Sequence, residues 1–155
     1  LPANRFEWSQ SADARAHERT MVHRYMDAAE RGDTAAIVAL LHEDISFAMP
    51  PEPESWTGRE EVVASWTEGC FGTPELGDRR CLLTAANMQP AVAGYSRHAD
   101  EGEYRPLALD VLRIEDGLIK QIITFAPKVF PAFGLPPALP ASSPGEGVST
   151  DGPSS

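Results

Sequence analysis

Cysteine, basic charge and long apolar runs are all scarce in this chain. Its 155 residues include only 2 cysteines, Cys70 and Cys81, which lack the C-x-x-C spacing of metal and redox sites. We therefore expect two reduced thiols instead of a disulfide or a metal site. No apolar run approaches the length of about eighteen residues that a membrane helix needs, and no secretory signal pattern opens the chain. These absences predict a cytoplasmic location and no membrane partner.

The shortage of basic residues bears on the partners of the chain. There are 13 Lys and Arg residues against 23 Asp and Glu, which gives a formal net charge of −10. Such a charge repels polyanions over long range, and no basic stripe offsets it, so we expect no direct binding of nucleic acid. The four histidines are scattered; His17 and His23 are six positions apart and would lie on different faces of a helix. We expect no metal and no cofactor.

The length suits one domain with a core of its own. The chain begins Leu1-Pro2, without an initiator Met, which suggests a fragment or a processed product. We expect an irregular leader at 1–10, a folded domain at 11–135 and a Pro/Ser/Gly-rich disordered tail at 136–155.

The most informative stretch is Tyr104–Ala126, which predicts two strands joined at Glu115-Asp116-Gly117. An Asp-Gly pair between alternating apolar runs is a strong hairpin signal, because Gly adopts positive φ freely. Alternation places Leu107, Leu109, Val111 and Arg113 on one face and Ala108, Asp110, Leu112 and Ile114 on the other. Asp110 thus stands in mid-strand against its propensity. It either pairs with a buried donor or lines a pocket.

The other segments complete an α+β prediction. Met21, Val22, Tyr25, Met26 and Ala29 form the apolar stripe of a helix over 11–31, and Asp33 is placed to cap a second helix that ends at Leu41. The remaining expected elements are a strand at 45–49, a helix from Thr57 to Gly69 with capping-box spacing, and strands at 80–88 and 91–97. We expect three N-terminal helices on a curved, mixed, mostly antiparallel sheet.

Several stretches carry a resemblance to a known family. The order of elements, and the W-x-G-R-E motif at Trp56–Glu60, resemble the SnoaL-like branch of the NTF2-like cone fold. Longer stretches resemble the C-terminal SnoaL-like domains of extracytoplasmic-function (ECF) sigma-70 factors from actinobacteria: Arg24–Asp33, Thr84–Tyr95, Glu103–Ile119 and Ile123–Pro140. The resemblance covers about residues 1–140. It implies that the sigma core regions would lie upstream in the same polypeptide, and nothing here resembles them.

The resemblance also implies a pocket between the concave sheet and the helices, which relatives use for proton abstraction, cyclisation or epoxide hydrolysis. Asp110 is the candidate general base, because desolvation raises the pKa of a carboxylate. The alternative is that Asp110 pairs with Arg80, Arg97, Arg105 or backbone N–H groups. The facing strand, 119–125, has Lys120, Gln121 and Thr124 and no second inward Asp, which counts against a hydrolase.

The predicted pocket contains eight further residues. Asn87 and Gln89 would offer amide hydrogen bonds or simply satisfy strand ends, and Tyr95 would orient a ligand or pack in the core. The expected apolar walls, for which core packing is the default alternative, are Phe47, Met49, Trp56, Trp66 and Phe125.

Three functions remain open. The first is a regulatory domain of an alternative sigma factor that modulates transcription initiation by contacting the sigma core domains of its own polypeptide, by binding a small apolar ligand, or both. The second is a stand-alone isomerase, cyclase or hydrolase with Asp110 as base. The third is a module that forms a homodimer through the open sheet face.

Overall fold

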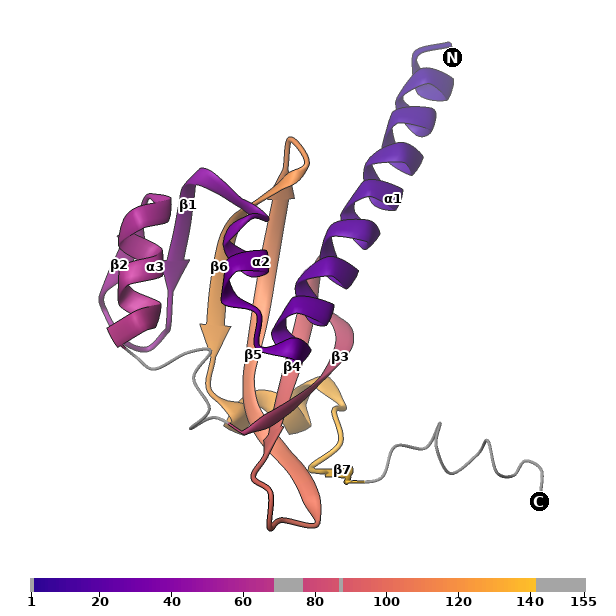
Figure 1. Ribbon diagram of the computed structural model, residues 1–155. Coiled ribbons are helices and arrows are strands. Elements are labelled where there is room, and N and C mark those ends of the chain that lie inside the picture. The colour runs from indigo at the N-terminus through magenta and orange to yellow at the C-terminus, as the bar shows by residue number, and fades with distance from the viewer. Residues whose placement is uncertain (1, 69–76, 87, 142–155) are drawn as a thin grey trace, which may run out of the picture.

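The computed structural model describes residues 2–68, 77–86 and 88–141, with side chains from residue 15 onwards. Figure 1 shows helices and a curved sheet, as the α+β prediction requires. The helices are α1 (Pro2–Arg31), the single turn α2 (Thr34–Val38), α3 (Arg59–Glu68) and the 3-10 helix η2 (Pro127–Phe133). The strands are β1 (Leu41–Ala48), β2 (Ser55–Thr57), β3 (Asp78–Ala86), β4 (Gln89–Arg97), β5 (Glu103–Glu115), β6 (Leu118–Phe125) and β7 (Leu139–Pro140).

The sheet is mixed and mostly antiparallel, as predicted. Its strand order is β2-β1-β6-β5-β4-β3, and β7 pairs with β5 away from this path. Only the β1–β6 pair is parallel among the described strands; the others are antiparallel. No helix in the described part of the chain is long and apolar enough to cross a membrane.

The predicted hairpin is present as β5 and β6. Asp116 and Gly117 both adopt positive φ, at 55° and 75°, as a two-residue type I′ turn requires. Glu115 pairs with Leu118 across the turn. Local turn chemistry therefore sets the register of β5 and β6 next to the turn.

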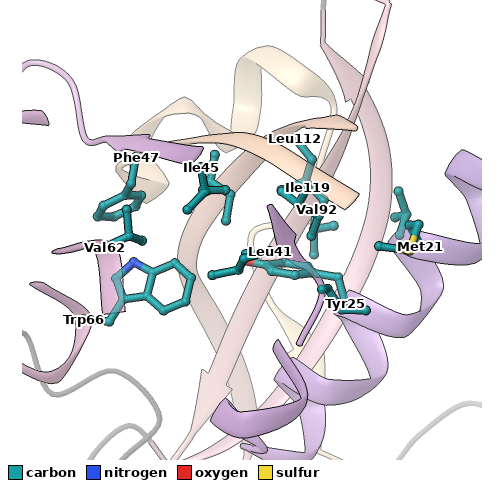
Figure 2. Packing of buried hydrophobic residues seen from close by; sticks show 13 residues of the cluster. Met21, Tyr25, Leu41, Ile45, Phe47, Val62, Trp66, Val92, Leu112 and Ile119 are labelled. Atoms are coloured by element: carbon teal, nitrogen blue, oxygen red, sulfur yellow. The ribbon is translucent and has the colours of Figure 1, made fainter. Parts of the chain in front are cut away.

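Apolar residues cover both faces of the sheet, and β5 contributes to each. Leu112 belongs to a cluster between the concave face and the helices, which Figure 2 shows with Tyr25, Phe47 and Trp66. Leu109 and Val111 belong to a second cluster on the opposite face, under η2. The predicted alternation is thus confirmed from Ala108 to Leu112, whereas Leu107, expected on the face of Leu109, lines the cavity on the concave face.

The expected irregular leader was wrong, because α1 begins at Pro2. No Gly or Pro interrupts the sequence from Ala3 to Arg31, and proline is favoured at the first helical position, where its missing N–H is not needed. Gly32, at φ 68°, ends the helix, and Asp33 Oδ1 accepts from the Ala36 N–H at 3.0 Å, which confirms its capping role.

Two other boundaries also differ from expectation. Leu41 does not end the second helix; it opens β1, fully buried and paired with Ile119 of β6. Trp56 and Thr57 do not open the third helix, because they form β2, in which Trp56 pairs with Phe47. Gly58, at φ 99°, turns the chain into α3.

The boundary expected for the disordered tail, at residue 136, was placed too early. The Tyr95 hydroxyl donates to the Pro136 carbonyl at 2.8 Å, β7 pairs with β5, and the Ala141 N–H donates to the Gly102 carbonyl at 3.2 Å. These bonds hold 136–141 against the sheet; residues 142–155 lie outside the described part of the chain.

Replacing Phe130 by Ala tests the packing of η2 on the sheet. Phe130 is 1% exposed and stacks edge-on against Tyr95, with ring centroids 5.2 Å apart. We expect the free energy of unfolding to fall by about 3–5 kcal/mol in urea titrations. Lys128→Ala, an exposed change in the same helix, should cost no more than about 0.5 kcal/mol. Equal effects of the two variants would show that η2 does not pack as described.

Candidate functional site

A cavity of about 400 Å³ lies between the concave sheet face and the helices. Its walls are mainly apolar: α1 and α2 contribute Tyr25 and Ile37, β1 contributes Phe47, Met49 follows that strand, and α3 contributes Trp66. Figure 2 shows Tyr25 and Trp66 approaching from opposite sides of this region, with sheet side chains between them. The volume falls within the range of small-molecule pockets in proteins.

Small side chains on three neighbouring strands leave this space open. Cys81 pairs with Gly94, and Gly94 pairs with Ala108, and all three line the cavity. A Cβ at Gly94 would lie 3.6 Å from the Ala108 carbonyl oxygen, an ordinary contact, so the backbone tolerates a side chain there. The hollow therefore follows from residue size and not from backbone conformation.

The polar centre of the cavity is the Asp110 carboxylate. Thr124, its cross-strand partner on β6, donates from Oγ1 to Asp110 Oδ1 at 2.7 Å. Tyr25, on α1, donates from its hydroxyl to Oδ2, also at 2.7 Å. Asp110 therefore both meets buried donors and lines a pocket.

Burial raises the pKa of Asp110, and the hydrogen bonds from Thr124 and Tyr25 oppose this rise only in part. Burial also raises the pKa of Tyr25 well above its ordinary value, and the neighbouring Asp110 adds to the shift. The pair thus holds its protons more firmly than the same groups in water. A carboxyl with a raised pKa in a cavity is a common feature of functional sites.

The pKa values of the Cys81 thiol and the Arg79 guanidinium at the cavity wall are also shifted. Burial, followed by Glu30, raises the pKa of Cys81 to about 12, so the thiol stays protonated and is a poor nucleophile. Burial lowers the pKa of Arg79. No group of three His, Cys, Asp or Glu in the described residues could hold a metal ion.

The cavity brings together Asp110 and four of the predicted walls. Phe47, Met49, Trp66 and Phe125 line it.

The remaining predicted pocket residues lie elsewhere. Trp56 stacks on Phe47 with centroids 5.5 Å apart but is outside the lining, and the Gln89 amide donates to the Leu112 carbonyl at 3.3 Å. Asn87 lies outside the described residues. Tyr95 differs most, since Ala91, Ala93 and Tyr95 alternate onto the opposite face and pack under η2.

The arginines considered as alternative partners of Asp110 do not reach it. Arg80 and Arg97 both stack over the Tyr104 ring, 5.7 and 5.5 Å from its centroid. Arg105 is exposed. Tyr25, the donor that sequence reasoning missed, was expected only as part of an apolar helical stripe, and no local sequence feature marked it as a hydrogen-bond donor.

Comparison with family models decides the family. Residues 22–122 match the model of the SnoaL-like domain. The chain belongs to the SnoaL-like domain family. Because the match includes Tyr25, Asp110 and the first strands of the sheet, the polar centre of the cavity lies within the matched domain, although Thr124 follows just beyond it.

The SnoaL-like domain is also similar to curated proteins. It is 30% identical over 130 residues to the ECF RNA polymerase sigma factor SigG of two Mycobacterium tuberculosis strains, CDC 1551/Oshkosh and H37Rv. The match covers 83% of this chain but only 34% of those proteins. The chain thus spans about a third of the length of the relatives it matches.

Solved structures support the NTF2-like fold. A putative ketosteroid isomerase from Kribbella flavida aligns with a TM-score of 0.54 and 24% identity, covering 72% of this chain and 78% of that one. An NTF2-like protein of unknown function from Burkholderia xenovorans aligns with a TM-score of 0.58 and 12% identity, covering 87% and 93%. At these identities the likeness concerns the fold alone.

Replacing Asp110 by Asn tests whether the pKa of this carboxyl is raised in the folded protein. A folded-state pKa raised above the unfolded one contributes stability below the unfolded pKa, and this contribution is lost as pH rises through the folded pKa. Across that window the wild type should lose stability relative to Asp110→Asn, by up to about 1.4 kcal/mol per pH unit. Urea titrations of both proteins from pH 3 upwards, in steps of about one unit, measure the difference.

Tyr25→Phe supplies the matched control, since it removes one hydrogen bond that lowers the pKa of Asp110. The pH at which Asp110 titrates, followed by NMR of its carboxyl carbon, should move upwards in this variant. If the wild type instead gained stability over Asp110→Asn with rising pH, Asp110 would be held ionised by its partners.

Proposed function

We propose that this SnoaL-like domain is a regulatory, ligand-sensing domain of an ECF sigma factor. The observation that carries the proposal is an apolar cavity with a half-buried carboxylate, hydrogen-bonded at both oxygens, in a chain similar to such a factor. The natural polypeptide would carry sigma core regions in addition to this domain. Ligand in the cavity would change how the domain contacts those regions and so modulate transcription initiation.

The cavity walls give a physical route from ligand to regulation. Tyr25 on α1 and Thr124 on β6 meet at one carboxylate, so the position of α1 depends on the same groups that line the cavity. A ligand that binds one position of α1 more tightly shifts the population towards it. Differential affinity of this kind is all that a sensor requires.

The charge of the domain supports contact with protein and not with DNA. A net charge of −10 disfavours approach to promoter phosphates but complements basic surfaces on sigma regions or polymerase. We therefore assign promoter reading to other regions of the polypeptide.

Ala108→Leu tests the cavity, because the longer side chain extends into the space that Ala108 leaves open. Native mass spectrometry of the wild type should show a retained small organic molecule, and Ala108→Leu should lose it. Ala132→Leu, an exposed alanine in η2, serves as the control and should retain the molecule. An empty wild type across several expression hosts would remove the sensor proposal.

In vitro transcription tests the regulatory role. Deleting residues 22–135 from the natural sigma polypeptide should change promoter output by several-fold with core polymerase, and Ala108→Leu should abolish the response to ligand. Ala132→Leu should respond as the wild type does. Unchanged output after the deletion, with and without ligand, would contradict a regulatory role.

A second candidate is an isomerase-type enzyme with Asp110 as general base, favoured by the raised pKa of this carboxyl. Both carboxylate oxygens already accept hydrogen bonds, which makes Asp110 a weaker base than an unbonded one. Proton–deuterium exchange of an enolisable cyclic ketone provides the assay. Catalysis by Asp110 requires a loss of at least about 100-fold in Asp110→Asn.

A further inference from the structure

Arg79 places a positive charge on the wall of the cavity. It lies on β3, pairs with Ser96, and alternates onto the same face as Cys81, while Arg80 points to the other face and stacks on Tyr104. Arg79 is half-buried and lines the cavity together with Asp110. A guanidinium in such a place is poorly hydrated and still presents five N–H donors.

Within the described residues, this charge has no partner. The ion pairs found there use Arg31, Arg97 and Arg113, and no side-chain hydrogen bond found there involves Arg79. No ion pair between Arg79 and Asp110 is found in the described part of the chain; the donors found on Asp110 there are the Tyr25 and Thr124 hydroxyls. A partly desolvated cation without a bonded anion is costly, and an incoming anion would relieve that cost.

We propose that the cavity binds an organic monoanion, a carboxylic acid with an apolar body, whose carboxylate pairs with Arg79. This inference rests on the ligand-sensing function proposed above and names the chemical class of the ligand. The planar guanidinium matches a carboxylate in a two-bond geometry. The apolar body would lie against Phe47, Trp66 and Phe125.

The other charges of the cavity narrow the chemical class of the ligand. Glu52 lies at the lining and is exposed to water, and Asp110 lies within it, so the wall already carries more acidic groups than basic ones. A phosphate dianion would add two negative charges against a single guanidinium among the described lining residues. An amine would bring further donors to a carboxylate already bonded by two hydroxyls. A singly charged acid adds only one negative charge and brings no ammonium donors.

Three probes that differ only in their head group test the class on the 155-residue chain. Decanoate, decanol and decylamine, each below its micelle concentration, are titrated calorimetrically at low salt. We expect decanoate to bind about tenfold or more tightly than decanol, which is the gain of a charge-assisted hydrogen-bonded pair. Decylamine should bind no better than decanol. This comparison needs no variant.

Arg79→Gln should abolish the preference for decanoate over decanol. Arg80→Gln is the matched control, one position away on the opposite face, and should keep the wild-type preference. Arg79→Lys retains the charge without the planar fork and should give an intermediate preference. Melting curves of each variant confirm that the domain is folded.

Equal binding of decanoate and decanol, or a preference for decylamine, would overturn the assignment of a carboxylate. Equal loss of the preference in Arg79→Gln and Arg80→Gln would also overturn it, since the effect would then be general electrostatics. If decanol binds the wild type but not Ala108→Leu, the cavity is a ligand site and only the head group is misassigned. If no probe binds, the sensor function fails together with this inference.

Discussion

The structure depends on one half-buried carboxylate that accepts hydrogen bonds from a helix and from a neighbouring strand. Asp110 receives a hydroxyl from Tyr25 on α1 and another from Thr124 on β6, each at 2.7 Å. Loss of either donor would leave a half-buried acceptor with one bond fewer, at a cost of about 1–3 kcal/mol. The Tyr25 bond ties α1 to the sheet, and the Thr124 bond holds the carboxylate between two neighbouring strands.

Short-range features of the sequence predicted the sheet well. The Asp116-Gly117 turn sets the register of β5 and β6, and the alternation of side chains along β5 correctly predicted that Leu109 and Leu112 lie on opposite faces. Asp110 was identified by its low strand propensity, a signal that belongs to one residue and its neighbours. Features decided within a few residues of the chain were thus accessible.

Features that depend on contacts between distant parts of the chain could not be predicted from the sequence. Tyr25 and Asp110 are 85 positions apart, so nothing near Tyr25 distinguishes a hydrogen-bond donor from a core aromatic residue. Thr57 and Glu60 have capping-box spacing, yet pairing with β1 places Thr57 in a strand. Tyr95 was assigned to the pocket for its hydroxyl, without a view of which face η2 would cover. Tertiary partners overrode local preference in each case.

The continuity of α1 has a mechanical consequence. The helix is 30 residues long, and Tyr25 and Ala29, near its C-terminal end, line the cavity. At about 1.5 Å per residue, the opposite end lies roughly 35 Å away from Tyr25. Figure 1 shows that end projecting beyond the strands. Any small tilt of α1 about the Tyr25 contact is a short movement at the cavity and a long arc at Pro2, so the helix acts as a lever arm that magnifies displacement.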